Sequence, residues 1–212
     1  MTGELGAGEA ERLRECVAAG GVAVFPSDTV YGVCCDPESE DAARRMYELK
    51  GRPAARPAAI MFFGLDQAFA ALPELEEAER NAMDALLPGP VTLLLNNPAH
   101  RFGPACRTDP ATIGLRVPWL PESLAALAAL PGGVMQSSAN VSGEPDARTL
   151  EEVPVRLRQG ADLVLDGGEL PGRPSTVIDL RGFSTDRSWH VLREGALSRS
   201  AVQAALAPAL ER

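Results

Sequence analysis

Residues 20–32 read GGVAVFPSDTVYG, an apolar run that passes directly into a polar turn. The run Val22–Phe25 is short and uncharged, with glycine on one side and proline on the other, which is typical of a buried strand. The segment before it, Glu9–Ala19, is predicted to be helical, and the turn Ser27–Gly32 follows the strand at once. A helix, a buried strand and a polar turn therefore open the predicted fold.

The alternation of short apolar runs with helical segments continues along the chain. Further strands are predicted at Ala59–Phe63, Val91–Leu95, Thr112–Val117, Val134–Gln136, Leu163–Leu165, Thr176–Leu180 and Trp189–Leu192. Helices are also predicted at Asp41–Leu49, Leu75–Leu86, Glu122–Leu130, Ser198–Leu206 and around Glu151–Arg158. This pattern favours an α/β architecture. The 212 residues contain no repeat and no evident linker, so residues 1–212 are expected to form one domain.

Composition excludes several classes of protein. The apolar fraction of 45% and the charged fraction of 23% are typical of a globular protein. No apolar run approaches the ~20 residues of a membrane span, and the polar, acidic N-terminus does not resemble a signal peptide, so no membrane association and a cytoplasmic location are expected. The formal net charge of −9 disfavours tight nucleic-acid binding.

Cysteine and histidine are too few and too scattered for the usual metal or nucleophile sites. The four cysteines form no Cys-x-x-Cys pair, which predicts buried, reduced thiols rather than a disulfide framework or a zinc site. With only two histidines, histidine-based metal sites and Ser–His or Cys–His catalytic pairs are poorly supplied. No protein side chains are therefore assigned as metal ligands.

Lysine occurs once in the chain, at Lys50, against nineteen arginines. A single lysine in an arginine-rich chain indicates a site that needs a compact ammonium, although chance alone could also leave one. The preceding segment is predicted to be a helix that ends at Gly51, so Lys50, Arg52 and Arg56 emerge together at a helix end and the following loop. Three converging cations favour a polyphosphate site. The alternative is that Lys50 only stabilises the helix dipole.

The predicted strand Thr112–Val117 has two different faces. Alternation places Ile113 and Leu115 on the apolar face, and Thr112, Gly114 and Arg116 on the other face. That second face combines a hydroxyl, an open backbone and a guanidinium suited to a carboxylate or phosphate. The alternative is an ordinary solvent-facing side of a half-buried sheet.

Polar loops follow two other predicted strands, and an arginine ends a third. Gln136–Gly143 reads QSSANVSG, Pro174–Thr176 reads PST, and Arg193 ends the run that begins at Trp189. Small hydroxyl and amide side chains at strand ends can bind phosphate oxygens or a ribose, but they are also common turn residues. A Walker loop, a dinucleotide fingerprint and a Gly-x-Ser-x-Gly elbow are all absent from the sequence.

Eight segments, taken in order, resemble the YrdC-type threonylcarbamoyl-AMP synthases in their short, single-domain TsaC-like form. The segments are SDTVYG, LKGRP, LLPGPVTLLL, TIGLRVP, SSANVSG, LDGG, PSTVIDL and LREGALS. They span about residues 22–198, which is nearly the whole chain. The resemblance implies a single α/β domain with a twisted mixed sheet flanked by helices around a concave basic cavity.

The resemblance also implies a nucleotidyltransferase reaction. Threonine and bicarbonate form a carbamate that attacks the α-phosphate of ATP, giving threonylcarbamoyl-AMP and pyrophosphate. This is the first step of the threonylcarbamoyladenosine modification beside the tRNA anticodon. A separate transferase complex is the expected acceptor of the product, at most weak tRNA binding is expected of this chain, and Mg²⁺ is expected to accompany ATP.

Site residues follow from the same motifs. By resemblance, Lys50 and Arg52 are the catalytic residues, and threonine is bound by Thr29, Arg116 and Ser175. ATP is expected to be bound by Lys50, Arg52, Arg56, Thr112, Ser138, Asn140 and Arg193.

The sequence departs from the family pattern at four places. It has Pro26-Ser27 where the family usually has Pro-Thr, and Ser137 where proline is common. Met61 stands where many members place a histidine near threonine, and Ala54-Ala55-Arg56 replaces a frequent Asp-Asn or Asp-Lys. Amino-acid selectivity is the property that these changes affect most.

Two other functions fit parts of the sequence. A carbamoyl-adenylate-forming module of the hydrogenase-maturation type would use a similar pocket, but it belongs to much longer chains with acylphosphatase and zinc-finger-like parts. A non-catalytic RNA-binding or ribosome-maturation factor would use a concave basic surface. The acidic balance and the aromatic content of 5% argue against RNA binding.

Overall fold

A computed structural model describes residues 3–210 and arranges them around one nine-stranded sheet. The strands are β1 (Ala23–Pro26), β2 (Tyr31–Cys35), β3 (Ala59–Phe62), β4 (Val91–Asn96), β5 (Thr112–Arg116), β6 (Gly133–Ser138), β7 (Leu163–Val164), β8 (Thr176–Asp179) and β9 (His190–Arg193). Their order is β7-β1-β2-β6-β3-β5-β4-β8-β9. The pairs β1/β7, β3/β5 and β4/β8 are parallel and the other five are antiparallel. The predicted α/β fold with a mixed sheet is therefore confirmed.

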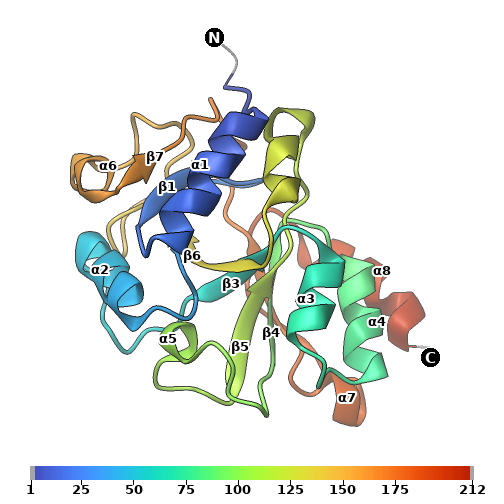
Figure 1. The fold of residues 1–212 in the computed structure, drawn as a ribbon. Coiled ribbons are helices and arrows are strands. Elements are labelled where there is room, and N and C mark those ends of the chain that lie inside the picture. The colour runs from blue at the N-terminus through green and yellow to red at the C-terminus, as the bar shows by residue number, and fades with distance from the viewer. Residues whose placement is uncertain (1–2, 211–212) are drawn as a thin grey trace.

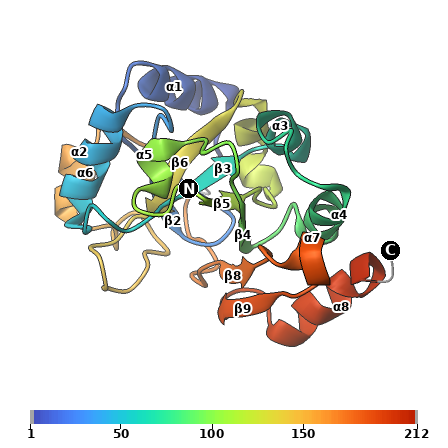
Figure 2. The ribbon, with the colours of Figure 1, turned by 90° about the horizontal axis from the view of Figure 1, so that it is seen from below.

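The helices form two groups outside the sheet (Figure 1). They are α1 (Ala7–Ala18), α2 (Glu40–Lys50), α3 (Leu65–Ala71), α4 (Glu77–Leu86), α5 (Gly103–Cys106), the 3-10 helix η1 (Glu122–Ala129), α6 (Val155–Gly160), α7 (Phe183–Asp186) and α8 (Arg199–Leu210). Helices α1, α2 and α6 lie toward one end of the sheet, and α3, α4, α7 and α8 lie toward the other (Figures 1 and 2). Helices α2, α3, α4, α5, α7 and α8 contribute buried residues to one hydrophobic cluster, and α1, α6 and η1 contribute to the other.

Helix α2 forms where its capping residues predict it. The Ser39 side chain accepts a hydrogen bond from the Ala42 amide at 3.2 Å, which satisfies one free donor of the first turn. Gly51 ends the helix in the left-handed region, at φ 57°, where a side chain would be strained. Lys50 is consequently the last helical residue, and the chain turns sharply after it.

Several elements differ from the sequence prediction. Strand β2 was not predicted, because Tyr31–Cys35 was assigned to a turn and to connecting chain, and α3, α5 and α7 were not predicted either. The segment predicted as the helix Glu122–Leu130 winds as a 3-10 helix. All four cysteines are free thiols, as predicted, but Cys16 is only half-buried. Within residues 3–210, no helix is long and apolar enough to cross a bilayer.

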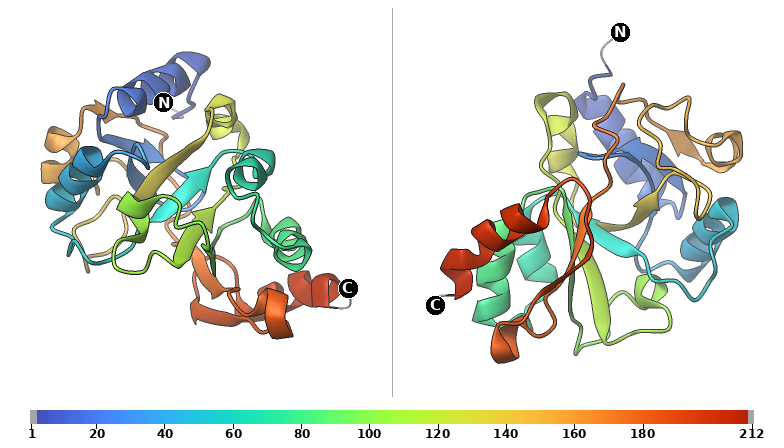
Figure 3. Two further views of the ribbon diagram at one scale, coloured as in Figure 1. Left: turned by 60° about the horizontal axis from the view of Figure 1, so that its bottom comes forward. Right: turned by 180° about the vertical axis from the view of Figure 1, so that it is seen from behind.

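The sheet curves so that its two ends approach one face of its centre (Figure 3). Along β5, Ile113 and Leu115 are fully buried in the core. Thr112, Gly114 and Arg116 lie on the opposite face, which lines a cavity. The predicted division of this strand into an apolar face and a cavity-lining face is confirmed.

Candidate active site

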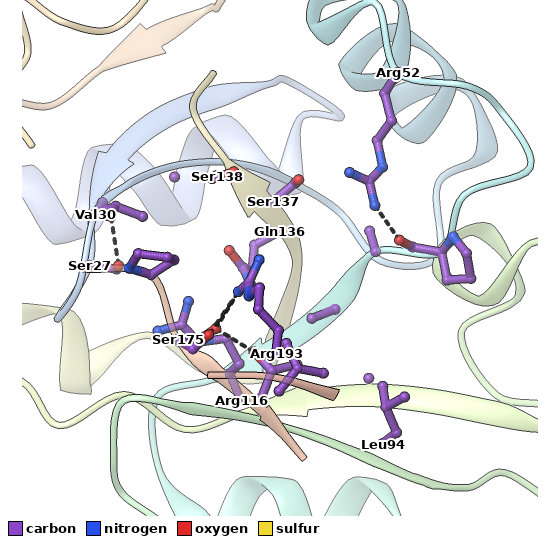
Figure 4. A pocket seen from close by; sticks show the side chains of 18 of the residues that line it. Ser27, Val30, Arg52, Leu94, Arg116, Gln136, Ser137, Ser138, Ser175 and Arg193 are labelled. Atoms are coloured by element: carbon purple, nitrogen blue, oxygen red, sulfur yellow. Dashed lines mark hydrogen bonds between the residues drawn. The ribbon is translucent and has the colours of Figure 1, made fainter. Parts of the chain in front are cut away.

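A cavity of about 410 Å³ lies on this face of the sheet and draws on seven strands or their ends (Figure 4). Most of its lining side chains are small or apolar, and the charged ones are four arginines and one aspartate. Its charged residues are Arg52, Arg116, Arg181, Arg193 and Asp109. A volume of this size suits a ligand of nucleotide class.

Three neighbouring strands set the order of groups along the cavity. In register, Asn96 of β4 lies beside Thr112 of β5, and Leu94 lies beside Gly114. Strand β8 runs parallel to β4, with Val177 beside Thr92. The floor therefore carries Arg116, Thr92 and Val177 at one end, apolar Gly114 and Leu94 in the middle, and Thr112 at the other end.

The inner end of the cavity is built on a buried ion pair. Arg116 donates from Nη2 to Asp28 at 2.7 Å, and the two side chains are only 5% and 3% exposed. The same nitrogen donates to Thr29 Oγ1 at 3.1 Å, while Arg116 Nε has no partner among the described residues. Burial raises the pKa of Asp28, and the Arg116 charge opposes that shift. Arg116 thus carries a donor that the described part of the protein leaves unsatisfied.

Ser175 and Arg193 face this inner end from β8 and β9. Ser175 shares a hydrogen bond of 2.8 Å with Thr92. Arg193 donates to the Ser175 carbonyl at 2.8 Å (Figure 4). Gly195 allows this arrangement, because a Cβ there would lie 2.1 Å from the Pro174 carbonyl oxygen. The glycine of the REGA segment is therefore required by close approach of two backbones.

Lys50 occupies a buried position beside the cavity. Its ammonium donates to the Ser138 carbonyl, to the Asn140 carbonyl at 2.9 Å and to Asn140 Oδ1 at 3.1 Å. Burial, together with the nearby charge of Arg52, lowers the pKa of Lys50 to about 8. An arginine fork would not match three oxygens converging on one point, so the lone lysine is accounted for by geometry.

The other predicted cations lie close to this loop. Arg52 lines the cavity, and its Nη2 donates to the Pro57 carbonyl at 2.5 Å. A smaller recess continues from the cavity and is lined by Lys50, Arg56 and Asn140, with Arg52, Ser138 and Arg193 shared between the two spaces. Arg56 is exposed at the rim of this recess and does not reach the main cavity.

The structure thus brings the sequence-predicted residues to one region. Six line the main cavity, namely Arg52, Thr112, Arg116, Ser138, Ser175 and Arg193. Lys50, Arg56 and Asn140 line the adjoining recess. Thr29, which is predicted to bind threonine, lies buried beside Arg116 and is not among the residues that line the main cavity. The roles assigned to these residues stay predictions.

The departures from the family pattern do not lie together, since Arg56 is at the rim of the recess and the other three are in or beside the main cavity. Ser27 and Ser137 both line the cavity. Met61 of β3 is fully buried and lies beside Arg116 of β5 in register, on the same face of the sheet, but it is not among the cavity-lining residues.

Sequence reasoning missed the cavity residues Arg181 and Asp109 and the buried partner Asp28. Arg181 follows β8 in a plain Asp-Leu-Arg run, which carries no motif. Asp28 is quoted within SDTVYG, but its contact with Arg116 spans 88 positions and leaves no local signal. Tyr31 was also unassigned, and its hydroxyl accepts from the Gly167 amide at 3.0 Å, which ties β2 to the LDGG segment.

Protein side chains offer little to a resident metal ion. Among residues 3–210, no group of three or more histidine, cysteine or acidic side chains is gathered closely enough to hold one. Asp109 is the single carboxylate among the residues lining the main cavity. Any cation that enters with a phosphate ligand would therefore take its oxygens mainly from that ligand.

The fold and the site define an α/β protein with an arginine-lined ligand cavity on one face of a curved mixed sheet. The chain matches the family model for Sua5, YciO and YrdC proteins, described as "Telomere recombination", over residues 15–195. The chain belongs to this family.

Named relatives share much of the sequence. It is 33% identical over 183 residues to a threonylcarbamoyl-AMP synthase of Chromohalobacter salexigens, covering 84% of this chain and 97% of the relative. It is 28% identical to a threonylcarbamoyl-AMP synthase of Bacillus subtilis, covering 88% of this chain but 53% of that protein.

Solved structures agree with the fold. The Sua5 protein of Pyrococcus abyssi complexed with L-threonine matches with a TM-score of 0.81 at 26% identity, covering 96% of this chain and 58% of that chain. The YciO protein of E. coli matches with a TM-score of 0.76 at 28% identity, over 90% and 91% of the two chains. A HypF structure matches at 17% identity with a TM-score of 0.71, which shows a shared fold only.

Proposed function

We propose that the chain is an L-threonylcarbamoyladenylate synthase, a nucleotidyltransferase. The threonine amine adds to bicarbonate and water leaves, giving a carbamate. A carbamate oxygen then attacks the α-phosphorus of ATP, and the bond to the β-phosphate oxygen breaks, so that pyrophosphate departs. Relatives named threonylcarbamoyl-AMP synthase at 33% and 34% identity support this proposal.

One observation carries the proposal: a buried guanidinium with an unsatisfied donor and a separate group of cations face the same cavity. Arg116 Nε is buried without a partner among the described residues. Arg52 and Arg193 line the cavity and form no ion pair with a described carboxylate. Two anionic groups on reactants held together, an amino-acid carboxylate and a polyphosphate, fit this distribution.

At the inner end, Arg116 would bind the threonine carboxylate. Asp28 and Thr29 fix the guanidinium from the protein side, which leaves its other edge for the substrate. Ser175, held by Thr92 at 2.8 Å, would orient the threonine hydroxyl or its carbamate. The P. abyssi Sua5 structure with L-threonine supports a threonine site on this fold.

At the other side, the cations would bind the phosphates of MgATP. Arg52 is half-buried and Arg56 and Arg193 are exposed, and all three line the recess, where they would approach oxygens of the β- and γ-phosphates. Lys50 would act differently, because all three of its N–H groups are used to hold the Ser138–Asn140 loop. Its charge stabilises the phosphates, and its hydrogen bonds position the loop that binds them.

Catalysis in this scheme requires no nucleophile from the protein, since both reacting groups belong to substrates. The chain holds the carbamate oxygen in line with the α-phosphorus and stabilises charge on the departing pyrophosphate. Hydrogen bonds to charged groups contribute about 1.5–3 kcal/mol, so loss of Arg52 or Arg193 should lower kcat/KM by roughly ten- to a hundredfold. The product would pass to a separate transferase complex that acts on tRNA.

The test is pyrophosphate release from MgATP with bicarbonate and each amino acid in turn, followed by mass spectrometry of the product. Release that depends on both threonine and bicarbonate, with threonylcarbamoyl-AMP as the product, is expected. Release without an amino acid but with carbamoyl phosphate would instead identify a carbamoyl-adenylate-forming protein. Retention of ATP binding with no turnover on any substrate would contradict the proposal.

A further inference from the structure

Arg181 lines the cavity at the end that is furthest along β5 from Arg116. Thr112 and Arg116 are the first and last residues of β5, which places their Cα atoms about 13 Å apart in an extended strand. The guanidinium of Arg181 donates to Thr112 Oγ1 at 3.2 Å. Arg181 therefore marks the outer end of the cavity, with the apolar patch of Gly114 and Leu94 between it and Arg116.

This arginine is held firmly by its neighbours. Its Nε donates to Asp179 Oδ1 at 2.9 Å and its Nη2 donates to Asp179 Oδ2 at 2.6 Å, so that the pair is bidentate. The Arg181 amide also donates to Asp179 Oδ1, and the Arg181 carbonyl accepts from Asn96 at 2.8 Å. The side chain is 43% exposed, yet three of its N–H groups are held, two by Asp179 and one by Thr112.

Charge separates Arg181 from the other cavity arginines. Asp179 neutralises Arg181 at close range, whereas Arg52 and Arg193 have no described carboxylate within ion-pair distance. A neutralised guanidinium attracts a phosphate less than an unpaired one does. It still has hydrogen-bond donors to offer, because three of its five N–H groups are used and two remain.

Thr112 completes this end of the cavity. Its oxygen accepts from Arg181, so its own O–H is directed elsewhere and can donate to a ligand. Asp109 also lines the cavity and contributes an acceptor, and the Thr112 amide donates to its carbonyl at 3.2 Å. Donors and one acceptor beside an apolar patch fit the hydroxyls and ring nitrogens of a nucleoside better than they fit an anion.

We propose that Arg181, positioned by Asp179, binds the uncharged nucleoside half of the nucleotide together with Thr112, an inference that rests on ATP being the nucleotide of the proposed reaction. The phosphates then lie toward Arg52 and Arg193, and the threonyl group lies at Arg116. A ligand that spans these three positions would lie along β5 from Thr112 to Arg116. Arg181 contributes to selectivity for the nucleoside and does not stabilise the charge of the reacting phosphates.

The test compares two ligands that contain different halves of ATP. Binding of adenosine monophosphate and of inorganic tripolyphosphate is measured by calorimetry for the wild type and for Arg181→Gln. The variant should bind adenosine monophosphate about tenfold more weakly, as expected for the loss of two hydrogen bonds, and should bind tripolyphosphate as the wild type does. An equal loss for both ligands, or no loss for either, would overturn the inference.

Matched variants keep the test interpretable. Arg187 directly follows α7, donates from Nη1 to the Phe183 carbonyl and does not line the cavity, so Arg187→Gln should bind both ligands normally. The double variant Asp179→Asn/Arg181→Gln removes the carboxylate that the single variant leaves unpaired. If the double variant recovers adenosine monophosphate binding, the loss in the single variant came from the unpaired Asp179 carboxylate, and Arg181 has no part in binding.

The binding measurement needs no turnover. Failure of the wild type to release pyrophosphate with threonine and bicarbonate would overturn the proposed reaction and leave the nucleoside measurement valid. Normal wild-type turnover with unchanged adenosine monophosphate binding by Arg181→Gln would overturn only the role of Arg181.

Discussion

At the residue scale, Lys50 is expected to make the position of the Ser138–Asn140 loop depend on the pH of the solution. Its ammonium donates to three oxygens of Ser138 and Asn140, and burial lowers its pKa to about 8. Above that pH the side chain loses its charge and one of its three N–H donors. ATP affinity measured by calorimetry should therefore fall by roughly tenfold or more between pH 7 and about 9.5.

The matched variant Lys50→Met should bind ATP weakly and without this pH dependence. An identical pH profile in Lys50→Met would show that another group is responsible. Stability should move in the opposite direction. The pKa of Lys50 is 10.5 ordinarily and about 8 in the folded protein. The unfolded chain therefore binds more protons between these values, and the Lys50 contribution to the free energy of unfolding rises with pH across that window.

Asp28 and Arg116 form a buried ion pair, in which each charge is stabilised by the other. The change Asp28→Asn removes the counter-charge from an arginine that is 5% exposed. The free energy of unfolding should drop by about 3–5 kcal/mol, measured by urea denaturation. The double variant Asp28→Asn/Arg116→Met should recover most of that stability while losing threonine binding. Equal stability of the single variant and the wild type would contradict the assigned ion pair.

Individual residues were predictable from sequence where their type was unusual, and not where their partner was distant. Lys50 could be found because it is the only lysine in the chain. Its function as the holder of the Ser138–Asn140 loop could not, since the contacts span 88 and 90 positions. The same applies to Asp28 with Arg116, and to Arg181 with Thr112, 69 positions away.

At the scale of elements, the sequence predicts the strands that begin and end clearly. Strand β5 was predicted from alternation alone, and both of its faces lie where expected. Strand β2 was missed because its first residues belong to the SDTVYG turn and Gly32 is a weak strand former, while its five residues are all buried. Hydrogen-bonded pairing with β1 on one side and β6 on the other stabilises Tyr31–Cys35 as a strand. The apolar residues at 122–129 favour a helix, and packing selects the 3-10 form.

The connection between β8 and β9 predicts a further effect at this scale. A Cβ at Gly195 would lie 2.1 Å from the Pro174 carbonyl oxygen and 2.7 Å from the Ser175 carbonyl carbon, both of them backbone atoms that cannot rotate away. The change Gly195→Ala should therefore separate Arg193 from Ser175. We expect the melting temperature to drop and KM for threonine to rise about tenfold.

The control for this variant is Gly8→Ala, within α1, where a Cβ would meet nothing within 4 Å. It should stabilise the protein slightly, because alanine favours helix over glycine by about 1 kcal/mol. A Gly195→Ala variant as stable and as active as the wild type would show that the two segments can move apart freely.

At the scale of the whole molecule, the charged residues that line the cavity are mostly basic, whereas the chain as a whole is acidic. The chain has a formal net charge of −9, yet arginines outnumber carboxylates four to one among the charged residues that line the main cavity. Such a distribution suits small anions that fit inside the cavity. It does not suit a long polyanion, which would lie against the acidic surface as well.

We therefore expect weak tRNA binding by this chain alone. At physiological salt the dissociation constant should lie well above about 1 µM, because few phosphates can be neutralised and the affinity of nucleic-acid binding depends on their number. Fluorescence anisotropy with labelled tRNA over a salt series measures both the affinity and its slope. The variant Arg52→Gln should lose ATP binding and leave the tRNA signal unchanged, since the cavity is too small for a folded RNA. Submicromolar binding that weakens steeply with salt and disappears in Arg52→Gln would assign the cavity to RNA. The chain would then be a nucleic-acid-binding protein, and the division between adenylate synthesis here and transfer to tRNA elsewhere would be wrong.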